Sequence, residues 1–196
     1  MEMNNVTYGN PTIEYKKILT ETCLVSDLFA KLKSESFPSN DSELTKDELN
    51  EIVDYLASMK EADNASFLKR YKAYDRSLSQ VIISTFKQRN IDLEELVKEI
   101  ISDIRSLIFK LKYYYQRPRP YQLADYYKLA LFPYTSHSDD TPSYPSGHGV
   151  EAYVILNIIG NKYPKQYSFC KEVIDDVMIS REYLGLHYSS DNDFAV

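Results

Sequence analysis

Apolar side chains recur every three or four positions between residues 93 and 111, and no other part of the sequence constrains the fold as strongly. This spacing puts them on one wide face of an α-helix, and such a face must pack against other elements. Asp92 and the acidic pair after Leu93 favour a helix start there. The helix must stop before Pro118, because proline disfavours helical geometry at the residue that precedes it. We therefore expect a long helix packed against several others.

Similar patterns predict helices along most of the chain. Glycine is scarce, at 5 residues, which favours long helices over a sheet of short hairpins. We expect an all-α fold, a helical bundle forming a single domain over residues 1–196. The expected helices are 11–34, 46–60 after a capping box at Thr45-Lys46-Asp47-Glu48, one from Asp63 or Asn64 to about 88, 121–131, Ser146 to about Tyr163, one from Pro164, and a last one from Ser189 or Ser190, with a loop over 132–145.

The bulk composition limits the class of partner and the compartment. A net charge of −6 argues against a nucleic-acid partner, because such proteins carry an excess of Lys and Arg. No apolar stretch approaches the roughly 20 residues that cross a bilayer, so we expect no integral membrane segment. No secretory leader is evident, so we expect an unexported, cytoplasmic protein, or a periplasmic one if a leader has been removed. Cys23 and Cys170 form no paired motif, which favours buried free thiols over a disulfide or zinc site.

Three short strings bring together residues that suit phosphate chemistry. A phosphate monoester needs several donors at once, and arginine offers a planar fork while lysine offers a point charge. A glycine at a helix start lets an oxyanion approach free backbone amides. A carboxylate four residues after a histidine can hold one ring nitrogen and leave the other as a nucleophile. The strings are Lys112 followed after six residues by Arg119-Pro120; Pro145-Ser146-Gly147-His148; and Ser180-Arg181, then His187 and Asp191.

Taken one at a time, these residues have simpler interpretations. A single Lys or Arg is more often a surface charge than part of a site. Ser146 can be an ordinary helix cap beside a partly exposed His148, and Asp191 can cap a helix near a surface His187. The combination and spacing of all three strings favour a site.

The three strings resemble the motifs of the type 2 phosphatidic acid phosphatase and vanadium haloperoxidase superfamily. The resemblance covers residues 112–191, and Tyr121 after Arg119-Pro120 makes it most similar to the bacterial class A non-specific acid phosphatases. Relatives continue the last helix beyond the position of Val196, so the sequence leaves open a truncated C-terminus. Gly149 also departs from the Thr or Ala that relatives often carry.

The resemblance implies a phosphomonoesterase that needs no metal and no cofactor and that works through a phosphohistidine. By this resemblance, His187 attacks phosphorus, Asp191 supports it, and His148 protonates the leaving oxygen. The phosphoryl oxygens are held by the remaining matched residues: Lys112, Arg119, Ser146, Gly147 and Arg181.

Two matters stay open at this stage. Lys110 with Arg117-Pro118 satisfies the first string as well as Lys112 with Arg119-Pro120, and only one lysine can face the site, because the two point about 200° apart on a helix. We favour Lys112 and Arg119. The alternative functions are a vanadate-dependent haloperoxidase and a non-catalytic phosphate-binding relative. The expected partner is a small phosphorylated substrate, and the sequence leaves a homo-oligomer open.

Overall fold

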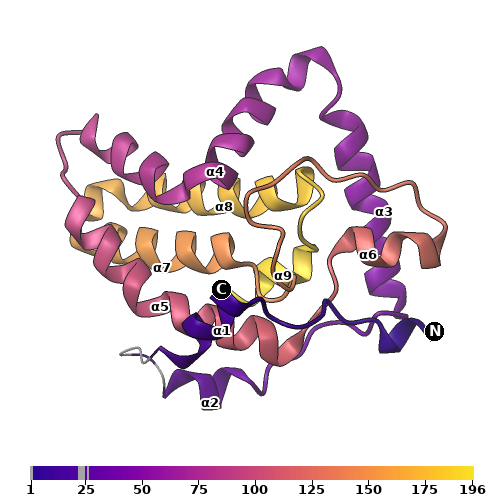
Figure 1. The fold of residues 1–196 in the computed structure, drawn as a ribbon. Coiled ribbons are helices and arrows are strands. Elements are labelled where there is room, and N and C mark those ends of the chain that lie inside the picture. Colours follow the sequence, from indigo (N-terminus) through magenta and orange to yellow (C-terminus); the bar gives the residue numbers. More distant parts are fainter. Residues whose placement is uncertain (1, 22–24, 26) are drawn as a thin grey trace.

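The computed structural model describes residues 2–21, 25 and 27–196, and in these residues it contains helices and no strand. The predicted all-α fold is confirmed (Figure 1). Short 3₁₀ turns occur at Met3–Asn5, Ala62–Asn64, Asp125–Tyr127 and Pro164–Gln166. The helices are α1 (Ile13–Thr20), α2 (Leu28–Leu32), α3 (Glu43–Ser58), α4 (Ala65–Lys87), α5 (Glu94–Tyr115), α6 (Pro120–Ala124), α7 (Gly147–Lys162), α8 (Tyr167–Tyr183) and α9 (Ser189–Asp193).

The N-terminal region differs from the single helix expected over residues 11–34. It holds two short helices, α1 and α2, and α1 ends at Thr20. The Thr12 side chain caps α1 by accepting a hydrogen bond from the backbone N–H of Tyr15. Cys23, for which we expected a buried free thiol, lies outside the described residues.

The predicted capping box at the start of α3 is wrong. The helix begins at Glu43, and its cap is Ser42, whose hydroxyl oxygen accepts from the backbone N–H of Thr45 at 3.1 Å. Thr45 and Glu48 therefore lie inside the helix, where a glutamate finds no free N-terminal N–H from which to accept a hydrogen bond. The Glu48 side chain is left to bond elsewhere.

Helix α5 agrees closely with its prediction. The carboxylate of Asp92 accepts from the backbone N–H of Glu94, and the helix ends at Tyr115, with Gln116 in the left-handed region at φ 52°. Lys112 thus lies in the last turn, and Arg119 follows just beyond the end, as expected. Helix α4 covers the predicted range from Asn64 but bends at Ser77, whose φ and ψ of −166° and 84° are not helical.

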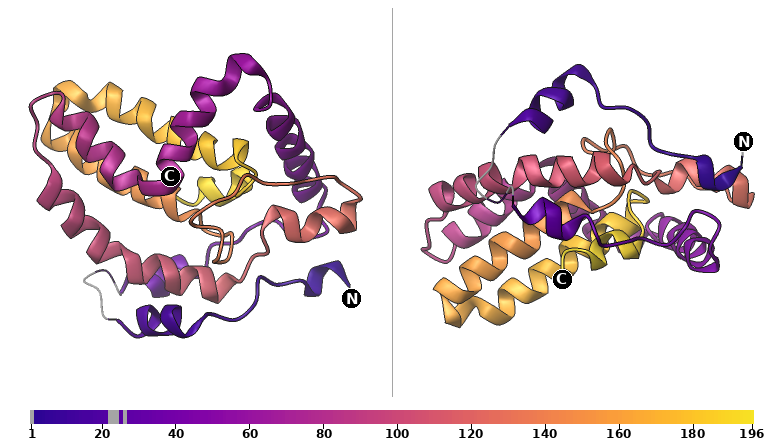
Figure 2. Two further views of the ribbon diagram at one scale, coloured as in Figure 1. Left: turned by 45° about the horizontal axis from the view of Figure 1, so that its top comes forward. Right: turned by 90° about the horizontal axis from the view of Figure 1, so that it is seen from below.

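The core lies between the α7–α8 pair and helices α4 and α5. Helices α7 and α8 run side by side along most of their length, and α5 and α4 pack against them (Figures 1 and 2). The buried side chains of this core include Leu78, Phe86, Val97, Ile104, Ala152, Ile155, Ile159 and Val177. Cys170 is buried there as a free thiol, as expected.

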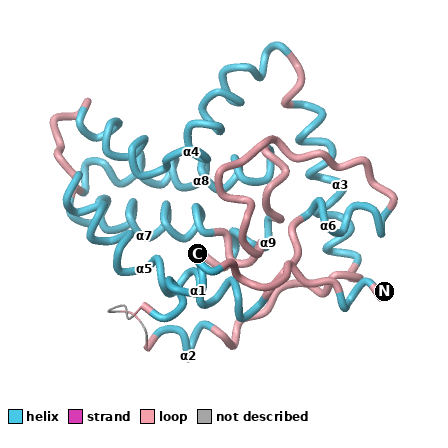
Figure 3. Tube along the Cα trace, in the orientation of Figure 1, coloured by secondary structure: helices cyan, strands magenta, loops and turns pink. Residues whose placement is uncertain are grey.

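A smaller apolar cluster joins α3 to α6 and to the start of α9. Its buried members are Leu49, Ile52, Leu56, Leu123, Ala124, Leu131 and Tyr188. A long loop then leads from α6 back to α7 (Figure 3). Its backbone is bound to the first and the third string, because Ser143 N–H donates to Arg117 O and Tyr134 N–H donates to Leu184 O. These tethers bring the three sequence strings to one place.

Candidate active site

The start of α7 presents free backbone amides at the position of the second string. The Ser146 hydroxyl caps this helix by accepting from Gly149 N–H at 3.2 Å, and Ser146 N–H donates to Asp191 O. A Cβ placed on Gly147 would lie 3.6 Å from Cε of Lys112, so the lysine side chain ends against this helix start. The N-terminal end of a helix favours an anion, and a lysine beside it adds a full positive charge.

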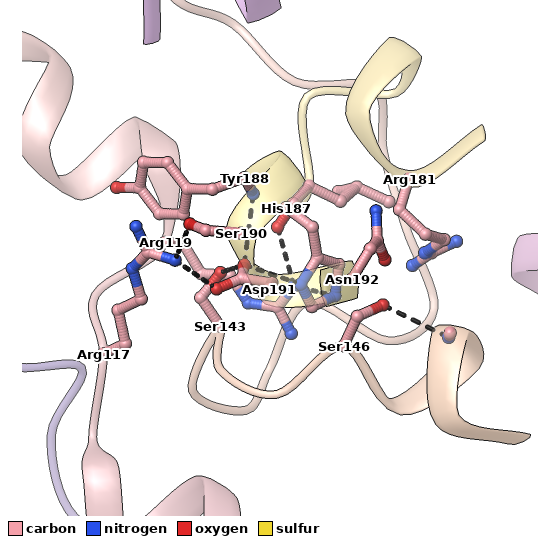
Figure 4. A network of polar contacts seen from close by, with 12 residues as sticks. Arg117, Arg119, Ser143, Ser146, Arg181, His187, Tyr188, Ser190, Asp191 and Asn192 are labelled. Carbon is pink, nitrogen blue, oxygen red and sulfur yellow. Dashed lines mark hydrogen bonds and ion pairs between the residues drawn. The ribbon is translucent and has the colours of Figure 1, made fainter. Parts of the chain in front are cut away.

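His187 is buried, and its two ring nitrogens have different partners. Arg119 Nη1 lies 2.8 Å from His187 Nε2, and Asp191 Oδ2 lies 3.0 Å from Nδ1 (Figure 4). A guanidinium can only donate, so Nε2 must offer its lone pair and Nδ1 must carry the proton that Asp191 accepts. His187 is therefore a neutral imidazole whose unprotonated nitrogen, Nε2, faces a cation.

Three buried cations lie in this region, close to His187 or to the start of α7. Lys112, Arg119 and Arg181 are 4%, 0% and 0% exposed, and we call them the cationic cluster. Lys112 Nζ donates to the carbonyl oxygens of Pro142 and Ser143, and Arg119 donates to those of Ser138, Thr141 and Leu186. Among the described residues, no carboxylate forms an ion pair with Lys112 or Arg119. The cluster thus carries positive charge that an anion can neutralise.

Arg181 is the one member of the cationic cluster with an ion pair in the described part of the chain. Its Nη1 lies 3.0 Å from Asp75 Oδ1 on α4, and its Nη2 donates to Ser138 Oγ. Its Nε is buried without a hydrogen-bond partner among the described residues. A buried donor without a partner costs roughly 1–3 kcal/mol, which a bound oxyanion would recover.

The pKa values of the site follow from burial and from this crowding of positive charge. Burial, Arg119 and Lys112 hold the pKa of His187 well below its usual range, although Asp191 opposes them. Burial and Arg119 likewise lower the pKa of Lys112, and burial lowers the pKa of Arg181 to about 10. The lowered pKa values mean that the site disfavours further positive charge. A bound phosphate dianion would raise these pKa values again.

His148 belongs to the same electrostatic environment as His187. It is partly exposed at the start of α7. Burial of its ring and then Arg181 hold its pKa well below the usual range, and Lys112 and Arg119 act in the same direction. Lys112 and Arg119 therefore lower the pKa of both histidines.

Asp191 is held as an anion by several donors at once. Burial raises its pKa, but Arg117, His187 and the hydroxyl of Ser143 outweigh this effect and hold the pKa below its ordinary value. Its Oδ2 accepts from His187, from Tyr188 N–H at 3.1 Å and from Ser143 Oγ, whereas its Oδ1 accepts from Arg117 Nη1 at 2.6 Å. The carboxylate is therefore fixed in the orientation that His187 requires.

The structure distinguishes between the two possible registers of the first string. Lys112 and Arg119 lie in the cationic cluster, whereas Lys110 Nζ donates to Glu21 O on another face of α5. Arg117 is also buried, but it faces α3 and α9, where it pairs with Glu48 and Asp191. All eight predicted site residues thus lie around one place, and the geometry favours the register that begins at Lys112.

Comparison with known proteins identifies the family. A family model described as the PAP2 superfamily matches residues 97–196, which is half of the chain. The chain belongs to the PAP2 superfamily. The matched region contains all three strings and excludes α1 to α4.

A solved structure supports the fold. The crystal structure of a transmembrane PAP2 type phosphatidylglycerolphosphate phosphatase from Bacillus subtilis superimposes with a TM-score of 0.54 over 94% of this chain and 89% of that one, at 18% identity. At this identity the likeness shows the PAP2 fold alone. No match is found among curated proteins. In the described part of this chain, no helix is both long and apolar enough to cross a membrane.

Two acidic residues that support the PAP2 site were missed in the sequence. Asp75 binds Arg181, Ser136, Ser138 and the backbone of His137, and burial opposed by Arg181 and Ser136 leaves its pKa at about 2. Glu48 binds Arg117 and the start of α9. Both lie in α3 and α4, outside the matched region, and neither stands in a recognisable spacing to a motif. The only signal in the sequence was that each charged residue stands among the apolar positions of its helix.

Proposed function

We propose that this PAP2 protein is a phosphomonoesterase that transfers the phosphoryl group to His187 and then to water. The observation that carries this proposal is the neutral imidazole of His187, with Nδ1–H bound to Asp191 and with Nε2 directed at Arg119. A nucleophile needs a free electron pair, a partner that stabilises the charge formed on attack, and cations for the developing negative charge. His187, Asp191 and the cationic cluster supply these three in turn.

The first step forms a bond between His187 Nε2 and phosphorus and breaks the ester bond to the leaving oxygen. That oxygen takes a proton from His148, so an alcohol leaves. Asp191 stabilises the cationic ring of the phosphohistidine by accepting a hydrogen bond from Nδ1–H. In the second step a water molecule gives a proton to His148 and attacks phosphorus, the P–N bond breaks, and phosphate leaves with His187 neutral again.

The phosphoryl oxygens would be bound by groups that lie close to His187 or to the start of α7. Arg181 offers its free Nε, Lys112 its ammonium, and Gly147 its backbone amide at the start of α7, while Arg119 would exchange its contact with His187 for one with the phosphate. Ser146 adds its hydroxyl. Donors fixed before the substrate arrives lower the reorganisation that accompanies the reaction.

The decisive experiment is trapping of the covalent intermediate. Wild-type protein mixed with ³²P-labelled phosphate monoester and quenched should retain acid-labile, alkali-stable label, and His187→Ala should retain none. Hydrolysis of p-nitrophenyl phosphate should be lost in the same variant and unchanged by EDTA. Phosphate binding with no turnover in the wild type would instead indicate the non-catalytic alternative.

Two further assays define the substrate and the alternative chemistry. Vanadate should inhibit hydrolysis competitively, and halide oxidation with vanadate and peroxide should be absent; halide turnover would favour a haloperoxidase. The motif resemblance to class A acid phosphatases favours small, varied monoesters, whereas the structural neighbour acts on a lipid phosphate. Comparing kcat/KM for p-nitrophenyl phosphate and for micellar phosphatidylglycerophosphate decides between them, and we expect the small ester to be the better substrate.

A further inference from the structure

We propose that Glu48, on α3, is a positioning residue for the nucleophile and acts through Arg117 and the first turn of α9. This inference rests on the proposed function of His187. Glu48 touches none of the reacting groups, and it lies outside the residues that the family model matches.

Both carboxylate oxygens of Glu48 are used, although the side chain is 3% exposed. Its Oε1 accepts from the backbone N–H of Ser190 at 2.7 Å and from the Ser189 hydroxyl at 2.9 Å. Its Oε2 accepts from Arg117 Nη2 at 3.2 Å. Glu48 therefore binds the first turn of α9, the helix that carries Asp191, as well as the arginine beside it.

Arg117 connects the two buried carboxylates. It is 1% exposed, its Nη1 donates to Asp191 Oδ1 at 2.6 Å and to Ser190 Oγ at 2.8 Å, and its guanidinium lies 3.9 Å from the centre of the Tyr188 ring. A planar fork stacked on an aromatic ring has little freedom to rotate. Arg117 thus occupies Oδ1 of Asp191 and leaves Oδ2 directed at His187 (Figure 4).

The charge balance of this group gives Glu48 an electrostatic role as well. Glu48, Arg117 and Asp191 together carry one net negative charge, because two carboxylates flank one guanidinium. Without the charge of Glu48, Arg117 and Asp191 would form a neutral pair. The other charged groups that face His187 are cations, Arg119 and Lys112. The net negative charge would therefore stabilise the positive ring of a phosphohistidine more than a neutral pair of Arg117 and Asp191 could.

The test compares Glu48→Gln with Glu51→Gln, a matched control on the same helix whose side chain is exposed. Gln keeps an oxygen for the start of α9 and removes the charge. For p-nitrophenyl phosphate we expect kcat to fall about tenfold to a hundredfold in Glu48→Gln, by analogy with residues that orient metal-binding side chains in other enzymes. KM and the vanadate inhibition constant should stay near wild type, because the cationic cluster is untouched.

A second readout does not depend on turnover. NMR titration of the His187 ring nitrogens should show a lower pKa in Glu48→Gln than in wild type, because a net negative neighbour has become neutral. If Glu48→Gln does not fold, Arg117→Lys tests the same set of contacts, since lysine lacks the planar fork whose two nitrogens bind Asp191 and Glu48 separately. This variant should lower kcat with KM retained.

The inference is overturned if the wild type hydrolyses substrate and a folded Glu48→Gln matches Glu51→Gln in kcat and in the His187 titration, or if KM rises at unchanged kcat. A wild type that forms no phosphohistidine refutes the proposed function instead, and the His187 titration still reports whether Glu48 acts on that ring.

Discussion

Replacing Gly149 by alanine tests whether the start of α7 is packed as tightly as the site requires. A Cβ at this position would lie 3.0 Å from Asn192 Oδ1 and 3.1 Å from Ser146 Oγ. Neither neighbour can move freely, because Asn192 Nδ2 is bound to Met178 O and Glu182, and Ser146 caps the helix. Gly149→Ala should therefore crowd two residues that border Asp191 and the anion-binding end of α7.

Two opposing effects decide the outcome of Gly149→Ala. Replacing a helical glycine by alanine stabilises a protein by about 0.4–1 kcal/mol when the new methyl fits. Overpacking of a buried site costs about 1–3 kcal/mol, and contacts this short place Gly149 in that class. We expect a net loss of about 1 kcal/mol in the free energy of unfolding, or about 2–4 °C in the midpoint of thermal denaturation for a chain of this size.

Gly147→Ala is the matched control for stability. A Cβ there would meet Lys112 Cε at 3.6 Å and Ile108 Cγ2 at 3.7 Å, which are ordinary contacts, so this variant should be as stable as wild type or more so. Urea and thermal denaturation of both variants measure the difference. If Gly149→Ala is stabilised as much as Gly147→Ala, the close packing of Asn192 over the helix start is refuted.

The remaining predictions concern the charges of the site. Because the pKa values of His187 and His148 are both lowered, kcat/KM should peak on the acidic side of neutrality. It should fall at higher pH as His148 loses its proton, and at lower pH as His187 gains one. A flat profile from about pH 4 to 9 would contradict this pairing. Arg119→Ala should weaken vanadate inhibition and lower kcat/KM by about 10²–10³, whereas Arg117→Ala should leave vanadate inhibition intact and destabilise the fold by about 3–5 kcal/mol; the reverse order of vanadate binding would favour the other register. Asp75→Asn should raise KM through loss of the Arg181 ion pair, measured against p-nitrophenyl phosphate, and an unchanged KM would show that Ser138 alone holds the arginine.

Local patterns in the sequence predicted most of the helices because their causes are local. The apolar period of 93–111, the stop imposed by Pro118 and the cap at Ser146 all act within a few residues, and α5 and α7 begin and end close to the predicted positions. The helix 11–34 was wrong because apolar spacing alone does not show where a helix is interrupted. The box at Thr45–Glu48 was wrong because Ser42 satisfies the helix start three residues earlier.

The sequence alone singled out the residues of the proposed site, because the residue types and spacings of the three strings are those that binding of a phosphoryl group requires. Only the tertiary structure decided how they are supported. The pairing of Arg117 with Glu48, the pairing of Asp75 with Arg181 and the contact of Glu48 with α9 join residues that are 69, 106 and 142 positions apart. Charges meet at such separations because the packing of α3, α4 and α9 brings them together, and no local pattern records where a buried charge finds its partner.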